Sequence, residues 1–176
     1  TSGKLGEIAL NKFFEQRYGF GVSLDFEVHP SEVPGQDIVG VVTKRGTKSI
    51  TNPPRLRVAI KTSKMKSVYL TAKATEVDVS SRASDVYVFV RVDLPQDHIF
   101  RLIRNHPSLT NLKDMIPDFI DLKGQVVGYA KHEELKNQPI TRLLPGSEQE
   151  IQPSRILRSG QLRCSESDWQ WLVSKL

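Results

Sequence analysis

The sequence predicts an α/β fold in which a mixed central sheet is flanked by helices. Three observations support this prediction: a helical pattern near the N-terminus, three β-like runs after it, and a nearly continuous apolar run, DVYVFVRV, at residues 85–92. Such an apolar run is typical of a strand at the buried centre of a sheet. The order helix, three strands, helix, strand and then more helix is that of a sheet covered by helices.

The N-terminal segment predicts a helix followed by a short strand. Residues 3–19 carry apolar side chains at helical spacing, and Gly19 and Gly21 end the pattern. Residues 23–28 suit a short strand, and the next segment, PSEVPGQ at 30–36, is expected to be a loop because of its Pro and Gly content.

The central segment predicts a long hairpin. Strands are expected at DIVGVVT, 37–43, and at RLRVAIKT, 55–62. Residues 44–54 between them are rich in Gly, Pro, Asn and basic residues, so we expect an extended tip that pairs the two strands. A tight SKMKS turn then leads to a strand, SVYLT, and to a helix near residues 72–79.

The second half has weaker signals. Pro107 and Pro117 punctuate two expected helices, 96–104 and 108–119. The further expected elements are a strand at 124–130, a short acidic helix at 132–135, a loop at 138–153, an edge strand at 156–162 and a C-terminal helix in SESDWQWLVSKL, whose Ser and Asp suit helix capping.

We expect one domain over residues 1–176. A chain of 176 residues can bury a genuine core, which we place at about residues 4–93, with C-terminal helices and short strands at 94–176. The first residue is Thr1 instead of Met, which is typical of a processed chain or of a fragment of a longer protein.

Composition excludes several classes of protein. No apolar run is long enough to cross a bilayer and no signal-peptide pattern opens the chain, so we expect a cytoplasmic protein without a membrane partner. The single cysteine, Cys164, excludes an intrachain disulfide, and the four histidines lack zinc-ligand spacing. The sequence contains neither a Gly-rich phosphate loop nor a Ser–His–Asp pattern.

Positive charge is concentrated in one part of the chain. Residues 38–75 contain nine Lys or Arg and no acidic residue, whereas the rest of the chain contains sixteen basic and twenty acidic residues. A basic block of this kind is the expected footprint of contact with a phosphate backbone. A solvated basic surface without a partner is the alternative.

The strand at 55–62 carries a pattern with chemical meaning. Side chains alternate along a strand, so Ala59 and Lys61 project to the same side, away from the expected core face. A carboxylate two residues before a lysine is a nuclease pattern, in which the acid binds a divalent metal and the lysine stabilises charge on the phosphate. Asp37 opens the preceding strand, and a hairpin would bring it to Lys61.

Glu7 on the first helix, Asp37 at the start of a strand, VAIKTSK and DVYVFVRV together resemble the PD-(D/E)XK, or restriction-endonuclease-like, superfamily over about half of the chain, residues 5–92. The resemblance implies an αβββαβ core and Mg2+-dependent hydrolysis of phosphodiester bonds in DNA, leaving a 3′ hydroxyl and a 5′ phosphate. It also implies that Asp37 binds metal, that Lys61 is the catalytic lysine and that Glu7 is an accessory acid. Gln36 stands where the name of the family has a proline.

The departure from the family pattern is Ala59, at the usual acid position. Three explanations remain open: a glutamate replaced by alanine in this chain, an acid supplied by Glu76 from the following helix, or an inactive domain that only binds. Some restriction enzymes of this superfamily take the acid from that helix, and Glu76 lies fifteen residues beyond Lys61.

We therefore expect a DNA endonuclease of a bacterial or archaeal restriction system. Its expected catalytic positions are Asp37, Lys61, Ala59 as the acid position, Glu7 and Glu76, and its candidate Mg2+ ligands are Asp37, Glu7 and Glu76. Contacts with double-stranded DNA are expected from Arg45, Lys48, Arg57, Lys64 and Lys66. We expect a homodimer, because double-strand cleavage usually needs two active sites.

The main alternative is a non-catalytic DNA-binding module of the same fold. A structural α/β domain, RNA cleavage and Holliday-junction resolution are further alternatives. The residues also have purely structural interpretations: Glu7 and Glu76 as solvated helix acids, Asp37 as a loop cap, and Lys61 as an edge-strand lysine that prevents aggregation.

Overall fold

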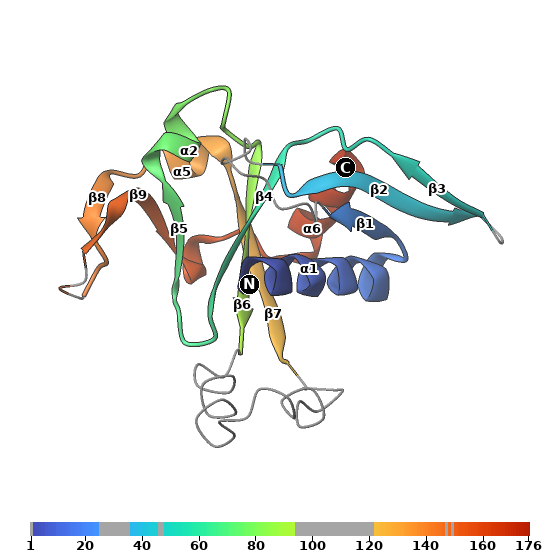
Figure 1. Cartoon of the computed structure of the whole chain (residues 1–176), viewed down its shortest axis with the longest axis horizontal. Helices are drawn as coiled ribbons and strands as arrows, with labels where there is room; N and C mark the ends of the chain where they lie inside the picture. The colour runs from blue at the N-terminus through green and yellow to red at the C-terminus, as the bar shows by residue number, and fades with distance from the viewer. Residues whose placement is uncertain (1, 25–35, 46–47, 94–121, 147, 149) are drawn as a thin grey trace, which may run out of the picture.

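The computed structural model describes residues 2–24, 36–45, 48–93, 122–146, 148 and 150–176. These residues form a mixed α/β structure with three three-stranded sheets, so the predicted α/β class is confirmed (Figure 1). In chain order the elements are α1 (Ser2–Tyr18), β1 (Gly21–Leu24), β2 (Ile38–Arg45), β3 (Lys48–Asn52), β4 (Val58–Lys64), β5 (Tyr69–Lys73), α2 (Ala74–Asp78), β6 (Val86–Val92), β7 (Gly124–Lys131), α5 (His132–Lys136), β8 (Ile140–Leu143), β9 (Glu150–Arg158), η2 (Ser159–Gln161) and α6 (Glu166–Lys175).

The central sheet has the strand order β4-β6-β7. β4 runs parallel to β6, with Val58 opposite Val86 and Lys64 opposite Val92, and β7 runs antiparallel to β6. The sheet is therefore mixed, as predicted. The predicted central strand is also confirmed, because β6 lies between its two neighbours and its first five residues are buried.

Side chains on β6 alternate between two cores. Val88 and Val90 belong to one core together with residues of α1, β1, β4 and α6. Tyr87 and Phe89 belong to the other core, which includes residues of β5, α2, α5 and β9. The central sheet is thus covered on both faces, which explains why β6 reads as a continuous apolar run.

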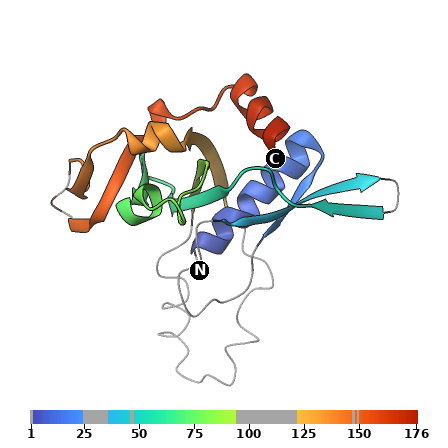
Figure 2. The ribbon, with the colours of Figure 1, turned by 90° about the horizontal axis from the view of Figure 1, so that it is seen from above.

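The other two sheets lie at opposite ends of the long axis. The sheet β1-β2-β3 lies on the right in Figure 1, and the sheet β5-β9-β8 lies on the left; the perpendicular view agrees (Figure 2). β2 and β3 extend away from the body in both views.

The predicted hairpin pairing is wrong. Segment 44–54 was expected to be a loop, but it contains β3, which pairs antiparallel with β2, from Val41 opposite Asn52 to Arg45 opposite Lys48. β2 therefore pairs with β1 and β3 through its backbone hydrogen bonds, and not with β4. The specific restriction-endonuclease-like core remains a prediction.

Two expectations for the second half are also wrong. Segment 138–153 was expected to be a loop, yet it contains β8 and the start of β9. β9 ends at Arg158 and lies in the middle of its sheet, so it is not an edge strand at 156–162. The expected helices at 96–104 and 108–119 lie outside the described residues.

The C-terminal helix α6 is formed as predicted. Ser165 caps it, because its side chain accepts a hydrogen bond from the backbone N–H of Asp168 at 3.2 Å. Trp169 and Leu172 are buried in the core that contains α1. No described helix combines the length and the hydrophobicity that a membrane crossing requires.

Candidate active site

Asp37 lies against β4, the outer strand of the central sheet. Its backbone N–H donates a hydrogen bond to the carbonyl oxygen of Val58 at 3.0 Å, and its Oδ2 accepts one from the backbone N–H of Ile60 at 2.5 Å. These two bonds hold the aspartate at the start of β4, although β2 itself pairs elsewhere. The carboxylate of Asp37 therefore lies at the edge of β4.

Lys61 and Glu76 form an ion pair beside this edge. Lys61 Nζ lies 2.5 Å from Glu76 Oε2, and the two side chains are 24% and 25% exposed. Glu76 belongs to the first turn of α2, which is anchored to the central sheet because Tyr87 Oη donates a hydrogen bond to the Glu76 carbonyl oxygen at 3.1 Å. The fold thus brings together two residues separated by fifteen positions.

Charged side chains surround Asp37. Burial is the main cause that raises the pKa of its carboxyl group, and the charge of Glu76 adds to the rise. The hydrogen bond from Ile60 and the positive charges of Lys61 and Lys4 oppose it. A carboxylate in this partly desolvated position would gain from an additional cation.

Glu7 comes close to this region from α1. The residue is buried, with 6% exposed, and its Oε2 accepts a hydrogen bond from Lys4 Nζ at 3.0 Å. Gly6 allows α1 to approach β4, since a Cβ at Gly6 would lie 1.9 Å from Thr62 Oγ1. This close contact places the first turns of α1 next to the strand that carries the lysine.

Ala59 lies in the hydrophobic core and not among the charged groups. It is 2% exposed and belongs to the same core cluster as Leu70, Ala72 and Tyr87. It shares one side of β4 with Lys61 because it precedes the lysine by two residues. Of the two candidate positions for the second acid, Glu76 is the one whose carboxylate meets the lysine.

The acidic side chains suit a hard cation such as Mg2+. They offer only oxygen ligands, and Mg2+ is usually bound by one or two carboxylates together with waters and substrate phosphates. Within the described residues, no three His, Cys, Asp or Glu side chains gather closely enough to hold a metal ion. The charge of Glu76 acts on the desolvated Asp37, and Glu76 has a second oxygen besides the one that Lys61 contacts, so these two carboxylates are the oxygen ligands that the site offers.

The lysines predicted to contact DNA are spread over the molecule. Lys64 and Lys66 are exposed at the end of β4 and in the turn that follows, on the strand that carries Lys61. Lys48 is exposed on β3 and Arg45 is the last residue of β2, so these two belong to the projecting hairpin.

Arg57 has a local structural role. Its Nη2 donates a hydrogen bond to the carbonyl oxygen of Ser81 at 3.1 Å, and its backbone N–H donates one to Asp85 Oδ2 at 2.8 Å. These contacts fix the turn before β6. Neither of these hydrogen bonds involves Lys61 or Glu76.

Lys4 is the residue near this site that sequence reasoning missed. It binds Glu7 and its charge lowers the pKa of Asp37. The available signal was its position three residues before Glu7, a spacing at which side chains on a helix meet.

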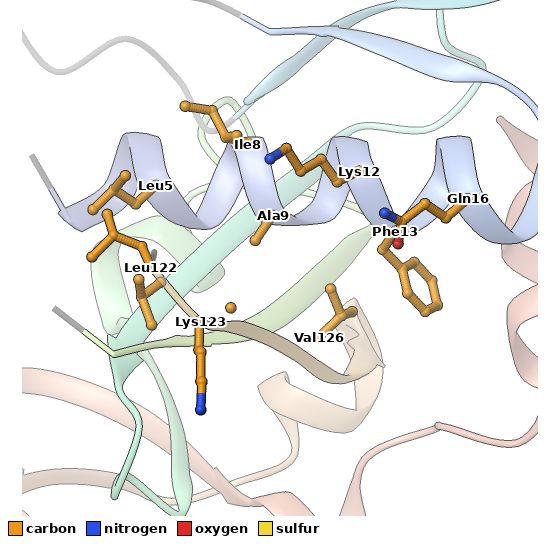
Figure 3. Close-up of a pocket in the computed structure, with 11 residues that line it drawn as sticks. Leu5, Ile8, Ala9, Lys12, Phe13, Gln16, Leu122, Lys123 and Val126 are labelled. Atoms are coloured by element: carbon orange, nitrogen blue, oxygen red, sulfur yellow. The ribbon is translucent and has the colours of Figure 1, made fainter. Parts of the chain in front are cut away.

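A separate cleft of about 780 Å³ runs between α1 and the start of β7. Leu5, Ala9 and Phe13 of α1 line it together with Leu122 and Val126 (Figure 3). None of the predicted site residues lines this cleft. Leu122, one of the lining residues, directly follows residues outside the described part of the chain.

Comparisons with known proteins gave no match: no protein-family model, no curated protein and no solved structure matches the chain.

Proposed function

We propose that the chain is a Mg2+-dependent DNA endonuclease in which Glu76 supplies the acid that Ala59 does not. The observation that carries the proposal is the placement of Asp37, Lys61 and Glu76 at one edge of the central sheet. The placement supports the proposal because metal-dependent phosphodiester hydrolysis uses carboxylate oxygens to hold the metal and a positive charge beside the phosphate.

The side chains have distinct roles in this proposal. Asp37 and Glu76 would hold the metal, which supplies an activated water and neutralises charge on the phosphate. Lys61 would contact a phosphate oxygen as its negative charge grows in the transition state. Since Lys61 also contacts Glu76, it orients the acid before substrate binds.

Lys4 and Glu7 would support this arrangement from α1. The positive charge of Lys4 favours the ionised form of Asp37, which is the form that binds metal. Glu7 holds Lys4 in place through their hydrogen bond. Glu7 is therefore proposed as a positioning residue, with metal binding left to Asp37 and Glu76.

The biological setting follows the resemblance to restriction endonucleases. We propose cleavage of double-stranded DNA by a homodimer, as part of a bacterial or archaeal restriction system. A non-catalytic DNA-binding module is the second candidate. Two observations favour it: an alanine stands at position 59, and the described residues contain no group of three or more His, Cys, Asp or Glu side chains that could hold a metal ion.

Cleavage of supercoiled plasmid tests the proposal. We expect nicked and linear products in Mg2+, and none when the metal is removed with EDTA. Salt-sensitive binding to duplex DNA without any cleavage, over a panel of plasmids of different sequence, would instead identify a binding module.

A further inference from the structure

The projecting hairpin formed by β2 and β3 has features of a binding element. All five residues of β3 are exposed. β1 pairs with β2 only as far as Val42, so the outer part, Thr43 to Arg45 with Lys48 to Ile50, is a two-stranded ribbon. A ribbon with little buried surface adds little to the stability of the protein.

The ribbon carries positively charged residue types on both of its strands. Arg45 pairs directly with Lys48, and Lys44 pairs with Ser49. Like charges at directly opposed positions of a strand pair are destabilising. Residues 38–75 contain no acidic residue that could compensate them locally. A polyanionic partner would turn this repulsion into attraction.

The polar residues of β3 suit contacts with base edges. Ser49 lies in the ribbon, and Thr51 and Asn52 follow it on β3 at the base of the ribbon; all three carry hydroxyl or amide groups and are exposed. Hydroxyl groups can bond to several bases, and Asn pairs with adenine through two hydrogen bonds in the major groove. The ribbon therefore combines groups for phosphate contact with groups for base contact.

From these observations we propose that the β2–β3 ribbon is a DNA-binding arm that enters the major groove of a B-form duplex. The major groove, about 12 Å wide, admits a two-stranded β-ribbon. The proposal deepens the proposed function, on which it rests, by naming the surface that holds the substrate.

The arm also has a defined reach. β2 begins one residue after Asp37 and has eight residues, which span about 26 Å as an extended strand. Since each base pair adds about 3.4 Å, the end of β2 lies at most about 8 base pairs from Asp37 along a duplex. Contacts made by the arm are therefore expected within about 8 base pairs of the cut.

Two triple variants with equal loss of charge test the arm. One carries Lys44→Gln, Arg45→Gln and Lys48→Gln. The matched control carries Lys123→Gln, Lys136→Gln and Lys175→Gln, all at exposed positions outside the arm. Binding of each to a fluorescein-labelled 24-base-pair DNA duplex of random sequence is measured by anisotropy in Ca2+ between 50 and 200 mM salt. An RNA duplex of equal length is measured in parallel.

We expect the arm variant to bind DNA at least tenfold more weakly. The slope of the logarithm of affinity against the logarithm of salt concentration should fall by the amount that about two to three phosphate contacts contribute. The control variant should stay within about threefold of the unmodified chain. The RNA duplex should bind more weakly, because its major groove is too deep and narrow for side chains to read. The melting temperature of the arm variant should be unchanged or higher, since a repulsive pair has been removed.

Each alternative outcome has a separate meaning. Equal weakening of DNA binding by both triple variants would show a diffuse charge effect and contradict the proposed arm. Unchanged DNA binding by the arm variant would contradict it too, and so would equal affinity of the unmodified chain for DNA and RNA. If the unmodified chain cuts plasmid while the arm variant binds DNA as well as the control variant does, the proposed role of the arm is wrong and the proposed nuclease activity is supported. If binding depends on the arm but no plasmid is cut, the arm stands and the nuclease is wrong.

Discussion

Lys61 Nζ lies 2.5 Å from Oε2 of Glu76, which joins the lysine of β4 to the first turn of α2. No acid stands two positions before Lys61 on the strand, because Ala59 occupies that place in the hydrophobic core. The relationship assigns the second carboxylate of the candidate site to a helix. In the proposed mechanism Lys61 would contact both this acid and the phosphate.

Removal of the lysine charge should stop cleavage and preserve binding. We expect Lys61→Met to lower the cleavage rate by at least about 100-fold, the loss typical of a group that stabilises transition-state charge. Affinity for duplex DNA should fall by less than about threefold, because one phosphate contact of many is lost. Single-turnover cleavage and anisotropy separate the two effects. A parallel loss of rate and affinity would show that Lys61 serves binding instead.

A glutamate at position 59 should not improve the enzyme. Ala59 is 2% exposed within a packed cluster, so Ala59→Glu adds volume and a buried charge there. We expect a loss of roughly 2–4 kcal/mol in the free energy of unfolding, measured with urea, and no gain in cleavage. Ala59→Val is the control for volume alone. A large gain in cleavage by Ala59→Glu would show that a glutamate has been lost at this position.

The ionised carboxylate of Asp37 should destabilise the folded protein when no metal is bound. Burial raises its pKa in the folded state, so the folded protein binds this proton more tightly than the unfolded chain does. The stabilising contribution is therefore fully present below the ordinary aspartate pKa and is lost as pH rises through the raised pKa.

Asp37→Asn keeps an oxygen that can accept the hydrogen bond from Ile60 and removes the charge. We expect a higher melting temperature than that of the unmodified chain at pH 7 without metal, a smaller difference at pH 4, and no cleavage. A lower melting temperature of Asp37→Asn at pH 7 would contradict the desolvated carboxylate.

The contact between α1 and β4 should depend on Gly6. A Cβ at Gly6 would lie 1.9 Å from Thr62 Oγ1, so Gly6→Ala must displace the helix or the strand. We expect a loss of about 2 kcal/mol in the free energy of unfolding, although Ala is intrinsically the better helix former. Gly3→Ala is the matched control, since nothing lies within 4 Å of its Cβ position, and it should be neutral or stabilising. Equal effects of the two substitutions would contradict the close approach.

The sequence predicted the elements whose local signals agree with their environment. β6 reads as a continuous apolar run because both of its faces are buried. α6 begins at a Ser with an Asp three residues later, which is a capping pattern, and α1 ends next to Gly19, which has a positive φ of 72°.

The elements that were missed have signals that conflict with their structure. Segment 44–54 was expected to be a loop because it is rich in Gly, Pro, Asn and basic residues. The five residues of β3 are all exposed, so no apolar alternation marks the strand. β9 contains Pro153, which favours a loop, and its pairing with β8 is irregular there, between Thr141 and Leu143. In both cases the tertiary environment overrides the local sequence.

The candidate site was predictable as a set of residue types but not as a geometry. Asp37 and Lys61 follow from strand position and alternation. The expected route of contact, a β2–β4 hairpin, was wrong. Asp37 is held at β4 by its backbone N–H, which donates to the Val58 carbonyl oxygen, and by its Oδ2, which accepts from the Ile60 N–H. The position of Glu76 depends on the turn after β4 and on the anchoring of α2 by Tyr87, which sequence spacing does not encode.

The most direct test of the central claim is Mg2+-dependent plasmid cleavage by the unmodified chain and by Glu76→Gln, measured side by side. Glu76→Gln keeps the size of the side chain and removes its charge, and Glu133→Gln at an exposed position of α5 is the matched control. We predict cleavage by the unmodified chain and by the control, and a rate at least about 100-fold lower for Glu76→Gln, beyond the 10–100-fold that loss of an outer-shell partner of a metal costs. Equal cleavage by all three proteins would contradict the assignment of Glu76, and no cleavage by any of them would contradict the nuclease itself.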